Sequence, residues 1–139
     1  MTEARVGLKQ RILSEMTVDY SNALERNFDL AKQFIRISKE GKVDVLVKEK
    51  VTGIEQILLY LIGKLYAKEA GYVSMGGVDN KELTDELGIP MGSLLPWQKK
   101  LREDNMIKQV KKGKTANHVI ATNAVEKILN QIDKKLNRP

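Results

Sequence analysis

The sequence predicts a mainly α-helical α+β protein with one small β-hairpin. Three observations lead to this fold class. Several stretches repeat apolar residues every three to four positions, as amphipathic helices do. Two of these stretches begin at a capping signal and stop at a glycine. Only short runs, near residues 42–50, 72–75 and 106–122, have β-strand character.

Length and composition limit the class of protein. The chain has 139 residues, which suits one domain, or one small domain with an extension. Hydrophobic residues make up 42% and charged residues 30%, so we expect a packed core rather than disorder. There is no cysteine, which excludes disulfides and cysteine nucleophiles and fits a reducing compartment. The start lacks the apolar segment of a signal peptide, and the longest apolar run, residues 57–62, is too short to cross a bilayer. We therefore expect a cytoplasmic protein with no membrane partner.

The net charge of +6 is unevenly distributed. Residues 1–50 hold 10 Lys and Arg against 8 Asp and Glu, and residues 51–98 hold 3 against 6. Residues 99–139 hold 11 against 4. This basic C-terminal part points to an anionic partner. A lysine-rich surface that only aids solubility is the alternative.

The first 50 residues are expected to form a helical extension with one short strand. A short helix is expected near residues 3–14, and a longer one over residues 19–38. Asn22 and Glu25 fit a capping box in the longer helix. The alternating Val43, Val45 and Val47 predict a half-buried strand within residues 42–50.

The longer helix also suggests how copies of the chain associate. Its apolar positions recur with a near-heptad spacing, at residues 20, 24, 27/28, 31 and 34/35. This spacing suits packing against another helix. We expect residues 1–50 to contribute to a homodimer, alone or with the C-terminal helix; completion of the monomer's own core is the alternative.

The middle of the chain has the clearest helix signals. Thr52 and Glu55 form a capping box, and the helix that they open runs to Gly71, a natural stop. Its apolar stripe is wide enough for a helix that is buried on most sides. Residues 72–75 are expected to form a strand. Asp79 and Glu82 then open a short helix that Gly88 closes.

Pro96 decides where the next helix begins. Residues 88–101, GIPMGSLLPWQKKL, combine an amphipathic pattern with a proline that lacks a backbone N–H. We expect Ser93 to be the N-cap, because Pro96 then lies in the first turn, where N–H groups have no partner within the helix. The helix would run over residues 93–104, with Leu94, Trp97 and Leu101 facing the core.

The remaining elements are a hairpin and a last helix. Residues 106–110 and 118–122 are expected to be strands, joined by a basic turn over residues 111–117, in which Gly113 permits a tight reversal. The last helix starts near Asn123. One of its faces carries apolar residues, at positions 125, 128, 129, 132 and 136.

Residues 82–122, ELTDELGIPMGSLLPWQKKLREDNMIKQVKKGKTANHVIAT, resemble the winged helix-turn-helix family of DNA-binding domains, as found in prokaryotic and archaeal transcriptional regulators. The positions that match the family pattern are Leu83, Leu87, Gly88, Ile89, Leu94, Leu101, Met106 and Ile107. The resemblance implies a winged helix-turn-helix domain over residues 51–123, an N-terminal extension over residues 1–50, and a C-terminal helix over residues 124–139 that packs on the core or on a dimer partner.

The resemblance also implies a double-stranded DNA partner. The second helix would enter the major groove, and the wing, residues 111–117, would contact the adjacent backbone or the minor groove. The residue chemistry agrees, because Gln98 can pair with an adenine edge, Ser93 can reach a base or a phosphate, and cations neutralise phosphates. The candidate DNA-binding residues are Ser93, Gln98, Lys99, Lys100, Arg102, Lys111, Lys112, Lys114, Thr115 and Asn117.

No other motif points to chemistry. His118 is the single histidine and is interpreted as a strand residue near the base of the wing. Asp79 and Glu82 are interpreted as helix caps rather than metal ligands. We therefore expect no enzyme activity, cofactor or metal, and no site for a small-molecule effector is visible.

Two alternatives to sequence-specific DNA binding stay open. The apolar Leu95 and Pro96 on the second helix would suit a winged helix that binds another protein. A nucleic-acid or chromatin binder with little sequence preference is the other alternative.

Overall fold

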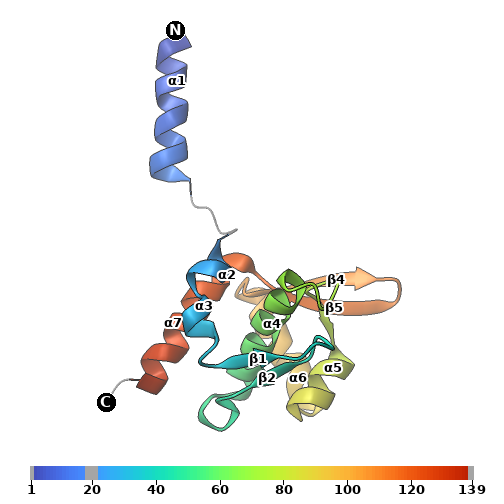
Figure 1. Ribbon diagram of the computed structural model, residues 1–139. Helices are drawn as coiled ribbons and strands as arrows, with labels where there is room; N and C mark the ends of the chain where they lie inside the picture. The colour runs from blue at the N-terminus through green and yellow to red at the C-terminus, as the bar shows by residue number, and fades with distance from the viewer. Residues whose placement is uncertain (1, 18–21, 138–139) are drawn as a thin grey trace.

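A computed structural model describes residues 2–17 and 22–137 of the chain. Its fold is α+β, with helices and two small antiparallel sheets (Figure 1). The elements, in order, are α1 (Thr2–Arg11), η1 (Ile12–Met16), α2 (Ala23–Arg26), α3 (Phe28–Ala31), β1 (Ile35–Ile37), β2 (Val43–Val45), η2 (Lys48–Lys50), α4 (Gly53–Glu69), β3 (Val78–Asp79), α5 (Asn80–Leu87), α6 (Met91–Glu103), β4 (Ile107–Lys112), β5 (Thr115–Ile120) and α7 (Thr122–Asn137). Within the described ranges, none of these helices has the length and apolar character needed to cross a membrane.

Helix α4 is the centre of the core, as its apolar stripe predicts. The predicted capping box is present: the Thr52 hydroxyl accepts from the Glu55 backbone N–H at 3.2 Å, and the Glu55 carboxylate accepts from the Thr52 N–H at 2.8 Å. Every residue from 57 to 64 is buried. Gly71 follows the helix with a φ of +85°, a left-handed conformation that glycine adopts without strain.

Strand β3 lies later than predicted. Residues 72–75 form no strand, and the short strand is Val78–Asp79, which pairs with β5. The glycine before it explains the position, because a Cβ on Gly77 would lie 3.0 Å from the Cβ of Asn117. Without a side chain at Gly77, the backbone can approach β5 closely enough to start pairing. The resulting three-stranded sheet has the order β3-β5-β4.

Helix α5 begins and ends as predicted. The Asp79 carboxylate accepts from the Glu82 backbone N–H at 2.8 Å, and Gly88 closes the helix with a φ of +70°. The reciprocal half of the predicted capping box is missing, because the Glu82 carboxylate instead accepts from the Tyr60 hydroxyl at 2.5 Å and from the Lys64 ammonium at 3.0 Å.

The predicted start of α6 is wrong. The N-cap is Pro90, whose carbonyl accepts from the backbone N–H groups of Ser93 and Leu94, each at 3.0 Å. Pro96 therefore lies in the second turn and removes one internal hydrogen bond, the one to the Gly92 carbonyl. A proline inside a helix costs about 3 kcal/mol. Burial of Leu94 and Leu101 offsets this cost, at about 1.5–3 kcal/mol for each side chain.

The hairpin β4–β5 turns more tightly than predicted. Lys112 pairs with Thr115, so only Gly113 and Lys114 form the loop. Gly113 has a φ of +64°, which suits the first position of a type II′ turn. Much of the predicted 111–117 turn is therefore strand, and the turn projects beyond the body (Figure 1).

The predicted helix over residues 19–38 is wrong. The chain forms two short helices and then β1, while Tyr20 lies outside the described residues. Asn22 makes no side-chain cap bond. At Asn27 the side-chain amide donates to the Ala23 carbonyl at 2.8 Å, a local bond of the kind that competes with a regular helix. The β-branched Ile35 and Ile37 then pair with β2.

The β1–β2 hairpin packs on α4, and a glycine makes room for it. A Cβ on Gly63 would lie only 2.5 Å from a methyl carbon of Val43. Val43 and Val45 are buried and Val47 is half-buried, as predicted, although β2 ends at Val45. The near-heptad positions Ala31, Phe34 and Ile35 are buried in this chain's own core. They are therefore unavailable as a dimer seam.

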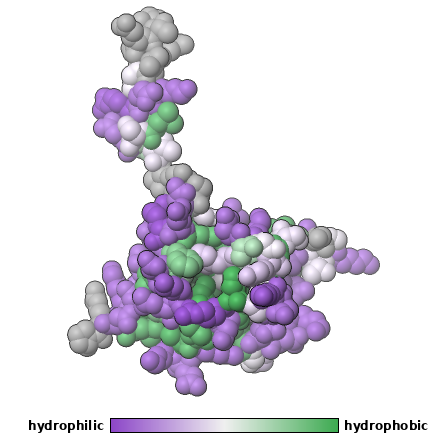
Figure 2. Space-filling view, viewed as in Figure 1, coloured by the Kyte–Doolittle hydropathy of each residue, from purple (hydrophilic) through white to green (hydrophobic). Residues whose placement is uncertain are grey.

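The two ends of the chain differ in how they pack. Helix α7 buries its predicted apolar face in the chain's own core: Val125, Ile128, Leu129 and Ile132. Helix α1 projects away from the body (Figure 1), and its continuation η1 is a π-helix. The apolar residues Leu8 of α1 and Ile12, Leu13 and Met16 of η1 are exposed, and a hydrophobic patch is visible on this projecting segment (Figure 2).

Candidate nucleic-acid interface

Helix α6 separates a buried side from an exposed side. Leu94 and Leu101 are fully buried and Trp97 is half-buried, as predicted. The indole of Trp97 packs on α4, where a Cβ on Gly53 would lie 2.4 Å from the ring. Away from this buried side, the helix exposes Leu95, Pro96, Lys99 and Lys100.

Gln98 is a correction to the predicted site. Its side chain is 1% exposed rather than outward. The amide Nε2 donates to Asn80 Oδ1 at 2.7 Å and lies 3.3 Å from Nδ1 of His118. Burying an amide without such partners would cost about 1–3 kcal/mol, so Gln98 is held in the core and does not reach a base edge.

His118 joins the hairpin to α6. The ring is 1% exposed, and its Nε2 lies 3.4 Å from the Arg102 guanidinium. Burial lowers the pKa of His118, the positive charge of Arg102 lowers it further, and a backbone hydrogen bond with Val78 acts in the opposite direction. A neutral imidazole has one acceptor nitrogen, so at most one of the contacts from Gln98 and Arg102 is a hydrogen bond donated to the ring.

The contact with His118 places cations of the hairpin and of α6 on one surface. Alternate strand residues point to the same face, and Gln109 pairs with His118. Lys111, two residues further along β4, therefore shares the face of the hairpin that meets Arg102. Lys111 is exposed and Arg102 is half-buried.

Lys99 and Lys100 lie on different sides of α6. At 100° per residue, Lys99 is about 60° from Arg102, whereas Lys100 is about 160° away and nearer to Trp97. Lys99, Arg102 and Lys111 therefore form the centre of the candidate interface, which we call the basic face. Lys100 lies at its edge.

The other predicted residues fall around this basic face. Lys114 and Thr115 are exposed at the hairpin turn, while Ser93 and Asn117 are half-buried. The side chain of Lys112 lies outside the described part of the chain. Lys108, which sequence reasoning did not select, is also exposed on β4, on the opposite face of the hairpin from Lys111.

Five of these lysines have no ion-pair partner among the described residues: Lys99, Lys100, Lys108, Lys111 and Lys114. Their charge is therefore open to an external anion.

Hydrogen bonds and an ion pair connect α5 to α4 and to the β1–β2 turn. The Lys64 ammonium donates to the Gly41 carbonyl at 2.7 Å and to Glu82 Oε2 at 3.0 Å, which links the β1–β2 turn to α5. Burial raises the pKa of Tyr60, and its hydrogen bond to Glu82 raises it further. In the sequence, Lys64 is visible as a charged residue that interrupts the apolar stripe of α4. Its partners come from distant segments, so the sequence does not reveal them.

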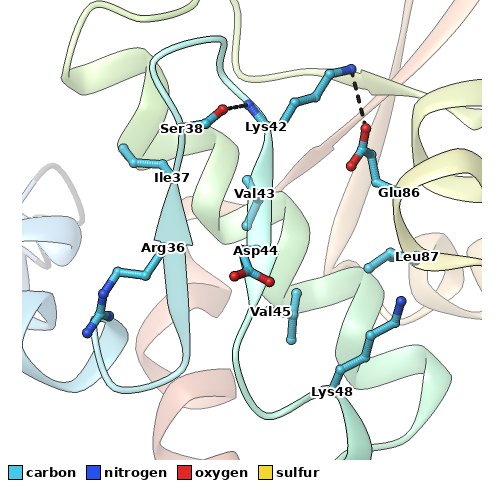
Figure 3. Close-up of a pocket in the computed structure, with 10 residues that line it drawn as sticks. All are labelled: Arg36, Ile37, Ser38, Lys42, Val43, Asp44, Val45, Lys48, Glu86 and Leu87. Atoms are coloured by element: carbon cyan, nitrogen blue, oxygen red, sulfur yellow. Dashed lines mark hydrogen bonds and ion pairs between the residues drawn. The ribbon is translucent and has the colours of Figure 1, made fainter.

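A hollow lies between the β1–β2 hairpin and α5 (Figure 3). It has a volume of about 450 Å³ and is lined by residues of both charge signs, among them Arg36, Lys48 and Asp44. Lys42 approaches Glu82 at 3.6 Å and Glu86 at 3.9 Å. Because its charges are mixed and partly paired, this hollow has no clear preference for an anion or a cation.

No protein-family model, curated protein or solved structure matches this chain.

Proposed function

We propose that this protein binds double-stranded DNA through a winged helix-turn-helix domain over residues 51–123 and that it regulates transcription. The order α4, β3, α5, α6, β4, β5 supports this proposal, because it supplies a helix pair followed by a hairpin beside the second helix. The observation that carries it is the contact between Arg102 of α6 and His118 of β5, which fixes the hairpin against the helix.

In this proposal α6 enters the major groove and the hairpin is the wing. Lys99 and Arg102 neutralise phosphates that flank the groove. Lys111 and Lys114 reach the adjacent backbone or the minor groove from the hairpin. The proposed DNA-contacting set is Ser93, Lys99, Lys100, Arg102, Lys111, Lys112, Lys114, Thr115 and Asn117. Gln98 supports the set from the core.

Selection from a random duplex library tests this function directly. Enrichment of one motif would support specific DNA binding, and equal recovery of all sequences would favour a binder without sequence preference. Competition with RNA provides a second arm, because the narrow major groove of an RNA helix excludes a side-chain-bearing α6. RNA that competes as well as duplex DNA would argue against the proposed geometry.

Binding to another protein is the second candidate, and one observation favours it. Met91 and Leu95 are 44% and 49% exposed on the side of α6 that faces solvent. Charge reversal of Lys99, Lys100 and Lys112 separates the two functions. It should abolish DNA binding, whereas it should leave an apolar protein interface intact.

A homodimer remains part of the proposal, through a different part of residues 1–50 from the near-heptad stretch. The apolar faces of residues 31–35 and of α7 are filled within one chain. The exposed apolar residues of α1 and η1 are the better candidates. Sedimentation equilibrium of the full chain and of a chain without residues 1–17 tests this assignment. The same number of chains per particle in both samples would reject it.

A further inference from the structure

The exposed side of α6 is apolar at its N-terminal end. Gly92, Leu95, Pro96 and Lys99 recur at spacings of three and four, so they share one side of the helix. Met91 lies one turn before Leu95 on the adjacent flank. This is the end of a recognition helix that meets base edges when the helix enters a major groove.

This end of α6 offers few side-chain groups that could form hydrogen bonds with a base edge. The side-chain amide of Gln98 donates to the half-buried Asn80 and lies 3.3 Å from the buried His118 ring, and a swing outward would break the bond to Asn80. Arg102 lies beside the hairpin, in the C-terminal half of the helix. Among the described residues of α6, the half-buried Ser93 and the terminal ammonium groups of Lys99 and Lys100 remain to donate to a base.

An apolar side chain in a major groove has one favourable partner on a base edge, the C5-methyl group of thymine. We propose that Leu95 recognises thymine methyl groups, so that the protein prefers A·T-containing duplexes. Gly92 leaves room for this contact. A Cβ built at Gly92 would have no neighbouring heavy atom within 4 Å, so the helix backbone can approach the base edge there. This inference rests on the proposed binding of duplex DNA.

Replacement of thymine by deoxyuridine isolates the methyl group. The test uses the full chain and two duplexes of about 20 base pairs with the same A·T-rich sequence, one containing thymine and the other deoxyuridine. The hydrogen-bonding groups are identical in the two duplexes. Burial of one methyl group corresponds to roughly a fourfold change in affinity, so the thymine duplex should bind about four to fifteen times more tightly if one or two methyl groups are covered.

Two variants locate the effect. Leu95→Ala should bring the affinity ratio of the two duplexes close to one. Leu46→Ala is the matched control, because Leu46 is a similarly exposed leucine, at 46%, that follows β2 rather than belonging to α6. The control should keep the wild-type ratio.

Three other outcomes would contradict thymine recognition by Leu95. Equal affinity of the wild-type chain for both duplexes, with salt-dependent binding retained, would overturn the inference and leave the proposed function standing. A ratio that persists in Leu95→Ala would overturn it as well, since the methyl group would then be sensed by another residue or through DNA shape. Absence of binding to either duplex would overturn the inference and the proposed function together.

Discussion

The side-chain amide of Gln98 donates to Asn80 at 2.7 Å, and this bond ties the second helix of the pair to the first residue of the preceding helix. Both helices flank the turn at Gly88, so the bond fixes the angle at which α6 leaves it. Gln98 therefore has a structural role that its position among lysines did not suggest. The orientation of the basic face depends on this buried contact.

Gln98→Ala should destabilise the fold. The change leaves the Asn80 side chain without its amide partner and opens a small cavity, so we expect the free energy of unfolding to fall by about 1–3 kcal/mol. Urea denaturation measures this loss. Asn80→Ala combined with Gln98→Ala should cost less than the sum of the two single changes, because both remove the same bond. Strict additivity would show that the two side chains do not interact.

Stability should depend on the protonation of His118. Its pKa in the folded state is lowered from the usual 6.5, mainly by burial. Below pH 6.5 the imidazole of His118 is therefore protonated more readily in the unfolded chain than in the folded chain. Stability is fully present above that pH and is lost as the pH falls through the lowered pKa. Urea midpoints between pH 7 and pH 5 should show this decline. His118→Gln removes the titrating ring, so an unchanged decline in that variant would assign the effect to another group.

Pro96→Ala should stabilise the protein. Alanine restores the backbone N–H that can donate to the Gly92 carbonyl, and it removes a ring that crowds this carbonyl. The gain of up to about 3 kcal/mol is reduced by about 0.4–1 kcal/mol, because proline restricts the unfolded chain. Thermal unfolding should give a higher Tm. Pro90→Ala is the control, since Pro90 precedes the helix and its replacement restores no helical bond. A lower Tm for Pro96→Ala would show that the proline fits this helix without strain.

Lys99 and Lys100 should contribute unequally to DNA binding. Lys99 lies on the side of Arg102 and Lys100 on the side of Trp97. Lys99→Ala should weaken binding to all duplexes and reduce the salt slope by about 1. Lys100→Ala, which removes the same charge from the adjacent position, should have a clearly smaller effect. Equal losses for the two variants would mean that the helix does not dock through the basic face.

The parts of the fold that sequence predicts well are those fixed by neighbouring residues. Thr52 and Glu55 cap α4 as predicted, and Gly88 closes α5 in a left-handed conformation, because three or four residues contain all the information for these features. The same holds for Gly113 at the hairpin turn. The order of elements around the candidate site followed from such local signals.

The incorrect predictions concern residues whose conformation or burial depends on contacts with segments far away in the sequence. Ile35 continues the helical spacing of the residues before it, yet Ile35 and Ile37 pair with β2. Gln98 looks outward by composition, yet Asn80 and His118 bind it from α5 and β5. Helix α6 begins after Pro90 rather than after Ser93, so Pro96 lies in the second turn, and the hydrogen bond that it lacks is offset by packing of Leu94 and Leu101 in a core built by distant elements. In each case the contact that decides is absent from the local sequence.

A salt titration of duplex binding tests the central proposal most directly. If each chain neutralises about 4 phosphates, the logarithm of the association constant should fall with the logarithm of salt concentration at a slope near −3.6. Substitution of Lys99 and Lys111 by alanine should bring the slope closer to zero. A flat salt response of the unmodified chain, or a failure to bind duplex DNA at low salt, would contradict the account.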